Sequence, residues 1–197
     1  ISDFSKAIKI NPKDPYAYYN RGYAKGELED YSGAISDYNK AIEINPKYGR
    51  AYGSRGVVKL MLKDYSEAIS DFSKAIKINP KYADAYYNRG YAKGELEDYS
   101  GAISDYNKAL EINPKYAWAY FNRGIAKERL EDYLGAIFDY NKAIENNTKY
   151  ADAYYNRGVL KERLEDYSGA ISDFSKAIAI NPKYVDAYYN RGVLKER

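Results

Sequence analysis

The amino-acid sequence repeats itself every 34 residues, and this period limits its possible folds more than any other feature. An Asn-Pro pair closes the repeating unit at 11–12, 45–46, 79–80, 113–114 and 181–182, and Asn147-Thr148 fills the remaining position. A fixed period of about 20–50 residues indicates stacked supersecondary units, each packed on its neighbours, instead of one central core. The sequence therefore predicts a solenoid.

The period divides the chain without remainder into one expected repeat array. Residues 1–14 correspond to the second half of a repeat, and residues 185–197 correspond to the first half of another. Full repeats are expected at 15–48, 49–82, 83–116, 117–150 and 151–184. Because the array begins within a repeat, we expect it to be part of a longer one, and the sequence leaves its cellular compartment open.

Each repeat carries two amphipathic patterns. In 83–116, small and apolar side chains recur at three- and four-residue spacing over both halves, which predicts two helices. Asp98 and Ser100 lie between them and can cap the second helix, and Pro114 disfavours its continuation. Where Thr148 replaces this proline, a longer or looser helix end is expected. The prediction for the chain is an all-α array of antiparallel hairpins with twelve helices.

This unit resembles the tetratricopeptide repeat, and the resemblance extends over the whole chain. It rests on the period, the helical hairpin and, in the third repeat, Gly90, Ala102, Tyr106, Ala109 and Pro114. The resemblance implies a right-handed superhelix, or α-solenoid. Its concave face, lined by the first helix of each pair, would bind an extended peptide or a partner helix. The implied function is a non-catalytic scaffold for protein–protein interaction.

Two charged positions recur in every copy and are expected to be structural. An arginine precedes the glycine of each first helix, at Arg21, Arg55, Arg89, Arg123, Arg157 and Arg191. An aspartate recurs in each second helix, at Asp3, Asp37, Asp71, Asp105, Asp139 and Asp173. Since an unpaired charge beside a tight contact is costly, we expect each aspartate to pair with the arginine of the following repeat, from Asp3–Arg21 to Asp173–Arg191. The alternative is an arginine that lies along the surface and reaches water.

One polar position repeats along the first helices and is a candidate for ligand binding. It comprises Asn20, Asn88, Asn122, Asn156 and Asn190, with Ser54 in the second repeat. An amide both donates and accepts hydrogen bonds, and the resemblance implies that such a ladder binds a peptide backbone. The adjacent column is aromatic, with Tyr19, Tyr87, Phe121, Tyr155 and Tyr189. We expect a peptide to be held by amide hydrogen bonds and aromatic contacts together.

Two places break the repeat pattern. In the second repeat Gly53 replaces the aromatic residue, and Leu60 and Met61 replace polar or small residues. We expect a notch there that receives an apolar anchor of the ligand, with neutral drift as the alternative. The fourth repeat holds Trp118, the single tryptophan, which either stacks against a partner or packs within the protein.

The composition excludes several functional classes. The 197 residues include no His and no Cys, so the commonest metal ligands and general base are missing, and no cofactor or metal is expected. The 31 basic residues are interspersed with 28 acidic ones, which argues against a basic face for nucleic acid. No apolar run approaches the about 18 residues that cross a bilayer. The expected partner is a protein or peptide.

Two alternatives to a peptide-binding scaffold remain open. One is a structural spacer or self-assembling array, and the other is the recognition arm of a larger enzyme. The first and last helices carry apolar faces without a partner helix. They predict head-to-tail self-association, in which two chains together complete one repeat.

Overall fold

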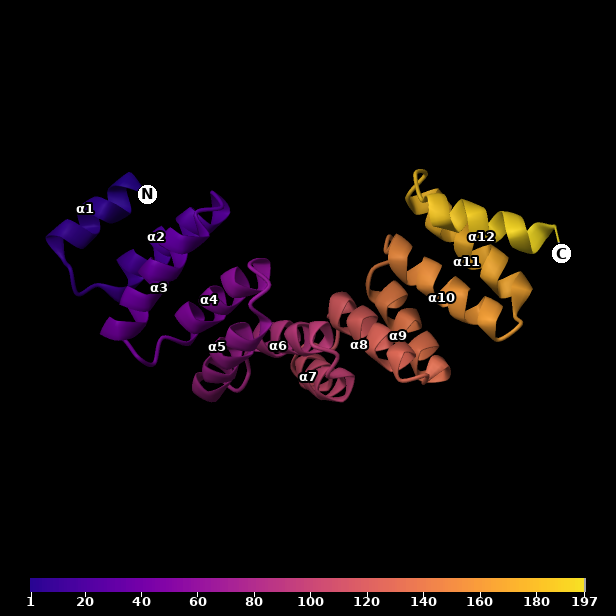
Figure 1. Cartoon of the computed structure of the whole chain (residues 1–197), viewed down its shortest axis with the longest axis horizontal. Coiled ribbons are helices and arrows are strands. Elements are labelled where there is room, and N and C mark those ends of the chain that lie inside the picture. Colours follow the sequence, from indigo (N-terminus) through magenta and orange to yellow (C-terminus); the bar gives the residue numbers. More distant parts are fainter. Residues whose placement is uncertain (197) are drawn as a thin grey trace. The chain divides into compact units, whose positions relative to one another are not determined.

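The computed structural model describes residues 1–196, and these form twelve α-helices (Figure 1). The helices are α1 (Ser2–Ile10), α2 (Pro15–Glu27), α3 (Tyr31–Ile44), α4 (Gly49–Met61), α5 (Tyr65–Ile78), α6 (Ala83–Glu95), α7 (Tyr99–Ile112), α8 (Ala117–Arg129), α9 (Tyr133–Asn146), α10 (Ala151–Arg163), α11 (Tyr167–Ile180) and α12 (Val185–Lys195). The predicted all-α fold and helix number are confirmed. None of the described helices has the length and apolar character that a membrane span needs.

The chain consists of two compact units, of which the first ends at Ile112 and the second begins at Asn113. In the first unit, α1 to α7 pack each against the next in sequence order, and in the second unit α8 to α12 do the same. The two helices of each predicted repeat form a hairpin: α2 with α3, α4 with α5, α6 with α7, α8 with α9, and α10 with α11. The hairpin is thus the element from which both units are built.

A glycine packed against an aromatic ring lies at the centre of each hairpin. A Cβ atom on Gly124 would lie 2.7 Å from Cε1 of Tyr140, and one on Gly158 would lie 2.8 Å from Cε1 of Phe174. Both rings are fully buried. Because these separations are shorter than van der Waals contact, any larger side chain on the first helix would push the two helices apart. Gly22, Gly56 and Gly90 take the same position in the other hairpins.

A three-residue turn ends the first helix of a hairpin and begins the second. Glu29 has a φ of 61° and donates its N–H to the carbonyl of Gly26 at 2.9 Å, while Asp30 donates to the carbonyl of Lys25 at 2.9 Å. This is a Schellman motif, in which the left-handed position is usually glycine. The carboxylate of Asp30 accepts the N–H of Gly33 at 2.9 Å and caps α3. The same positive φ recurs at Lys63, Glu97, Glu131 and Glu165.

The second helix ends at the same position with or without a following proline. Helix α9 contains 14 residues, as does α3, so the helix before Thr148 is not longer, contrary to the prediction. Asn147 is extended, with φ −145° and ψ 92°, and its side chain accepts the N–H of Lys149 at 3.1 Å. The asparagine and its turn are therefore sufficient to end the helix.

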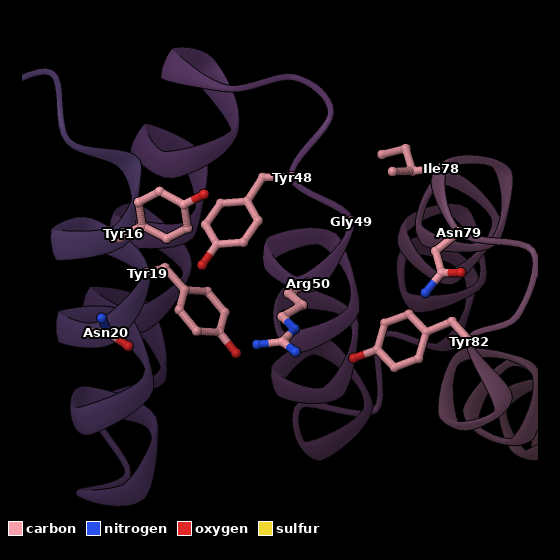
Figure 2. Close-up of a pocket in the computed structure, with 9 residues that line it drawn as sticks. All are labelled: Tyr16, Tyr19, Asn20, Tyr48, Gly49, Arg50, Ile78, Asn79 and Tyr82. Atoms are coloured by element: carbon pink, nitrogen blue, oxygen red, sulfur yellow. The ribbon is translucent and has the colours of Figure 1, made fainter.

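Aromatic rings join neighbouring hairpins. Tyr48, which precedes α4, lies against Tyr16 and Tyr19 of α2, with ring centroids 5.2 and 5.1 Å apart (Figure 2). In the second unit the ring of Tyr184 stacks on Tyr155 at 4.9 Å. Pairs at such distances contribute about 0.5–1.5 kcal/mol beyond the area they bury. Tyr48 and Tyr184, which precede α4 and α12, therefore serve as contacts between repeats within their units.

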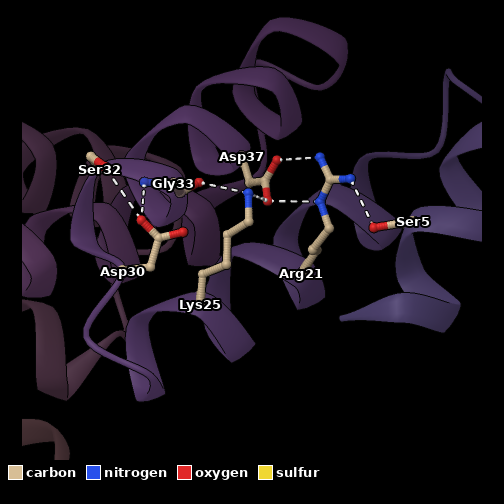
Figure 3. A network of polar contacts seen from close by, with 7 residues as sticks. All are labelled: Ser5, Arg21, Lys25, Asp30, Ser32, Gly33 and Asp37. Atoms are coloured by element: carbon tan, nitrogen blue, oxygen red, sulfur yellow. Dashed lines mark hydrogen bonds and ion pairs between the residues drawn. The ribbon is translucent and has the colours of Figure 1, made fainter.

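A buried ion pair connects the two helices of each hairpin. In the first hairpin, Nε and Nη2 of Arg21 donate to the two carboxylate oxygens of Asp37 at 2.9 and 2.6 Å (Figure 3). Nζ of Lys25 lies 2.8 Å from the same carboxylate, which is 4% exposed. Nη1 of Arg21 donates to Oγ of Ser5 on α1 at 3.2 Å. The guanidinium of Arg21 therefore connects the two helices of its own hairpin and also contacts the preceding helix α1.

The predicted register of these pairs was wrong. Asp37 was expected to pair with Arg55 of the following repeat, but Arg55 binds Asp71 of its own hairpin. Asp105, Asp139 and Asp173 likewise bind Arg89, Arg123 and Arg157. The physical reason is distance, because the glycine contact brings the two helices of one hairpin closest together. Across hairpins the arginine instead meets a serine or an asparagine.

The first and last charged positions show the consequence of this register. Asp3, which was expected to bind Arg21, is exposed and lies 3.3 Å from Nζ of Lys6. Arg191, which was expected to bind Asp173, donates to Oγ of Ser175 at 3.1 Å. Because the pairs form within hairpins, Asp3 and Arg191 have no partner of this kind. Asp3 instead contacts a lysine of its own helix, and Arg191 contacts a serine of the preceding helix.

Hydrogen bonding determines the ionisation of Asp37. Burial disfavours its charged form and by itself would raise the pKa, but hydrogen bonds from Arg21 and Lys25 favour the carboxylate. The net pKa of Asp37 lies below its usual 3.8, and the same pair raises the pKa of Arg21. A depressed folded-state pKa stabilises the protein above about pH 4, and this contribution is lost as the pH falls through the lowered value.

Replacing Asp37 by asparagine is expected to destabilise the first unit by about 3 kcal/mol at pH 7, since Arg21 and Lys25 lose a buried carboxylate. As the pH falls below 4 towards the lowered folded-state pKa of Asp37, the difference from wild type should shrink, because protonation of this carboxyl group favours the unfolded wild-type chain. Thermal unfolding followed by circular dichroism at pH 7 and pH 3 measures both effects. Glu43→Gln removes an exposed partner of Lys40 and should cost less than about 1 kcal/mol. Equal losses in the two variants would contradict the assignment.

Replacing Glu29 by glycine is expected to raise the free energy of unfolding by about 0.5–1 kcal/mol, because glycine adopts the left-handed conformation without the strain of a Cβ atom. Lys40→Gly, in the interior of α3, should lower it by about 1 kcal/mol. Urea unfolding of the two variants beside the wild type would measure the opposite signs. A loss of stability in both would argue against strain at Glu29.

Candidate functional site

A pocket with a volume of about 680 Å³ lies in the first unit, where the ends of α2, α4 and α5 meet (Figure 2). Helix α2 contributes three of the lining residues. The others come from the start of α4, the end of α5 and the residues just before α4 and α6. Its lining consists of Tyr16, Tyr19, Asn20, Tyr48, Gly49, Arg50, Ile78, Asn79 and Tyr82. We call this the tyrosine pocket.

Hydrogen-bonding groups converge on the tyrosine pocket from different helices. Figure 2 shows the guanidinium of Arg50 between the rings of Tyr19 and Tyr82. Burial is the main reason why the pKa of Tyr48 rises to about 12 and why that of Tyr82 is also raised. These hydroxyls therefore stay protonated at neutral pH and remain donors. Among residues 1–196, no carboxylate forms an ion pair with Arg50, so the pocket presents a cation beside aromatic walls.

The column of asparagines is divided between two roles. Asn20 is exposed and lines the tyrosine pocket. Asn190 donates to the hydroxyl of Tyr155 at 3.2 Å, and Oγ of Ser54 lies 3.3 Å from the hydroxyl of Tyr19. Both contacts join residues 35 positions apart in neighbouring repeats. This position therefore connects repeats at some copies and faces an open pocket at others.

A hollow of about 580 Å³ in the second unit brings an asparagine and an aromatic residue of the two predicted columns together. It is lined by Ile125, Glu128, Arg129, Glu131, Tyr133, Tyr155, Asn156, Val159 and Arg163. At its edge Arg163 lies over the ring of Tyr133 at 4.8 Å and donates to its hydroxyl at 2.6 Å. Asn156 is hydrogen-bonded to Tyr140. In each unit, therefore, the predicted columns contribute to one hollow.

The other residues of the two columns are placed mainly by aromatic packing. Phe121 lies 4.6 Å from the ring of Tyr150, and Tyr87 lies 6.0 Å from that of Tyr106. Tyr189 is 71% exposed. Asn88 and Asn122 are both half-buried, and Asn122 makes a polar contact. These side chains line neither of the two hollows described above.

The expected notch at Gly53 does not form. A Cβ atom on Gly53 would lie 3.1 Å from the ring and the hydroxyl oxygen of Tyr82, so this ring already occupies the space of the missing side chain. Leu60 packs against the buried cluster that contains Phe72. Met61 is 59% exposed and lines a separate hollow of about 170 Å³. The three residues therefore do not share one cavity, because the neighbouring repeat fills the gap that the sequence pattern left open.

Trp118 combines the two possibilities that its sequence position allowed. Its ring centroid lies 4.8 Å from that of Tyr150, yet the residue is 52% exposed. The ring therefore packs on one side and is accessible on the other.

The position of Trp118 is occupied by Arg50 in the second repeat and by Tyr16 in the first. Sequence reasoning missed Arg50, Tyr16 and Tyr82 as pocket residues. The signal for Tyr82 was the tyrosine that recurs one repeat apart before α4 and α6, as Tyr48 and Tyr82. The signal for Tyr16 and Arg50 was the variation between copies at their shared position.

Family models for the tetratricopeptide repeat match residues 15–48, 119–150 and 151–184, and a related TPR repeat model matches 60–96 and 93–131. Among curated proteins the sequence has no significant match. Within residues 1–196, no group of three or more acidic, histidine or cysteine side chains is placed to hold a metal ion. Proteins with these repeats generally act as scaffolds that bind proteins or peptides.

Solved structures with the same fold cover nearly the whole chain. YrrB, described as a TPR protein with an unusual peptide-binding site, is 28% identical with a TM-score of 0.80, over 96% of this chain and 97% of that chain. MamA is 25% identical with a TM-score of 0.78, over 84% and 96%. A tetratricopeptide repeat protein from Parabacteroides merdae, 22% identical with a TM-score of 0.78 over 91% and 72%, shares the fold. With its helical hairpins and with repeat matches over most of its sequence, the chain belongs to the tetratricopeptide repeat family.

Proposed function

We propose that this protein is a non-catalytic scaffold and that its tyrosine pocket binds an extended peptide segment of a partner protein. The observation that carries the proposal is the pocket itself, in which four tyrosines, two asparagines and Arg50 surround about 680 Å³. Sites that bind ligands commonly have volumes of about 300–1,000 Å³ and combine aromatic walls with a few polar groups. The pocket has both properties.

The chemistry of the lining suits a peptide better than a reacting substrate. The amide of Asn20 can donate to a carbonyl and accept from an N–H, which are the two groups that a peptide backbone presents. The side-chain oxygen of Asn79 accepts the N–H of Lys81 at 3.1 Å, and its NH₂ group can donate to a ligand carbonyl. The rings of Tyr16 and Tyr19 offer faces on which an apolar or aromatic side chain can pack. A site built from amides, rings and one arginine fits recognition of a chain segment.

The solved relatives support this proposal. YrrB, which covers nearly the whole chain, is described as having a peptide-binding site. We propose the same class of ligand here, bound through the residues that this sequence places in the tyrosine pocket. The pocket lies at the junction of two hairpins, so a bound segment would contact consecutive repeats.

Peptides selected on the wild-type protein from a phage-displayed random library are expected to lose affinity about five- to tenfold in the Asn20→Ala variant, because one hydrogen bond is worth about 1 kcal/mol. Tyr16→Ala should cause a similar loss through its missing aromatic face. Synthetic labelled peptides and fluorescence anisotropy would measure both. Asn20 and Tyr16 are exposed, so neither change should lower the melting temperature by more than a few degrees.

The matched control is Lys13→Ala, at an exposed residue in the loop before α2. It should leave the affinity of the selected peptides unchanged. Failure to enrich any peptide, or equal binding by the wild type and both pocket variants, would overturn the proposal.

A further inference from the structure

A second hollow in the first unit opens on a different set of side chains. Its volume is about 580 Å³, and it is lined by Pro46, Lys47, Tyr52, Lys74, Lys77 and Ile78. The first two belong to the loop before α4, Tyr52 belongs to α4, and the other three belong to the end of α5. Apart from Ile78, none of these residues lines the tyrosine pocket. We call this site the basic hollow.

The basic hollow carries three positive charges and no negative one in its lining. Lys47, Lys74 and Lys77 are all exposed, and among the described residues none of the three forms an ion pair with a carboxylate. Nζ of Lys74 lies 5.6 Å from the ring centroid of Tyr52, and the guanidinium of Arg55 lies 5.5 Å from the same centroid. The hollow therefore combines an aromatic surface with a concentrated positive charge.

The positive charge of the basic hollow can be compared with the equivalent positions of the other hairpins. The position of Lys77 is occupied by glutamate in three of them and by Ala179 in the last. Each glutamate is bound to the lysine that corresponds to Lys74, in the pairs Lys40–Glu43, Lys108–Glu111 and Lys142–Glu145 at 2.6–2.7 Å. Among the five hairpins only the second places lysine at this position, and α1, which has no partner helix before it in the chain, carries Lys9 there. Helix formation does not require it, because α3, α7 and α9 have the same length with glutamate.

Stability alone does not explain Lys77. Glutamate and lysine one helical turn apart stabilise a helix by about 0.2–0.5 kcal/mol, whereas two lysines at that spacing destabilise it by a similar amount. The second hairpin therefore gives up a small stabilisation and gains a focused positive potential. Such a potential attracts ligands of opposite charge and guides their approach.

We infer that the basic hollow is a docking site for an acidic segment of a partner protein. Carboxylates of the segment contact Lys47, Lys74 and Lys77, and one of its apolar or aromatic side chains packs on Tyr52 and Ile78. A short acidic segment matches the size of the charged area, since the neighbouring hairpins present neutralised lysine–glutamate pairs. Nucleic acid needs a longer track of cations to neutralise successive phosphates. The inference concerns a separate surface and does not rest on the proposed peptide binding in the tyrosine pocket.

The test measures binding of a fluorescein-labelled synthetic peptide of glutamate and aspartate residues with one central phenylalanine, by anisotropy at low ionic strength. Lys77→Glu, which gives the second hairpin the arrangement of three others, is expected to weaken binding about tenfold, because reversing one charge removes an attraction and adds a repulsion. Lys63→Glu makes the same change in net charge. It is the matched control, since the other turns carry glutamate at this position, and it should change the affinity less than twofold.

A gain-of-function variant makes the test independent of any loss of folding. Glu111→Lys reproduces the three lysines of the basic hollow in the third hairpin, where Lys81, Tyr86 and Lys108 occupy the equivalent positions. It should raise the number of peptides bound per chain from one to two. Asn20→Ala, in the tyrosine pocket, should leave binding of the acidic peptide unchanged.

Three results would overturn the inference. They are the absence of binding by the acidic peptide, equal weakening by Lys77→Glu and Lys63→Glu, and tighter binding of a single-stranded oligonucleotide of the same net charge. The second result would mean that only net charge matters, and the third would assign the hollow to nucleic acid. Equal melting temperatures of the variants and the wild type would establish that each comparison involves folded protein.

Discussion

The close approach of the two helices within a hairpin is the constraint on which the remaining structure depends. It exists because a glycine on the first helix faces a buried ring on the second, as Gly124 faces Tyr140. At this separation the arginine beside the glycine reaches the aspartate across the hairpin, as Arg21 reaches Asp37. A buried carboxylate of this kind must be paired, since leaving a charge unpartnered in the interior is costly. The small residue and the ion pair therefore support the same geometry.

Differences between copies carry the functional information, since identical positions only describe the architecture. Arg50 provides a cation at a position where the first repeat has Tyr16, and Lys77 replaces a glutamate that is paired in three other hairpins. Both residues belong to the second hairpin. Each of the two surfaces that we propose as binding sites therefore includes one substitution that the fold does not need.

Sequence reasoning predicted the hairpins well because their signals are local. The apolar spacing, the capping aspartates and the terminal asparagine act within one or two helical turns. The proline proved dispensable, since α9 ends at Asn146 as its counterparts do. The predicted ion-pair register failed, and so did the notch at Gly53, where Tyr82 occupies the space. Both errors concern distances between side chains that lie far apart in the sequence.

By itself, the sequence determined the repeat length, the two helices of each repeat, the family and the chemical inventory of the surfaces. These features depend on spacing along the chain, and spacing is visible without coordinates. Only the tertiary structure decided which aspartate each arginine binds, which ring lies over Gly53, and which side chains surround the tyrosine pocket and the basic hollow. Those outcomes depend on how closely particular helices and loops pack, and packing distances are set jointly by residues from several segments.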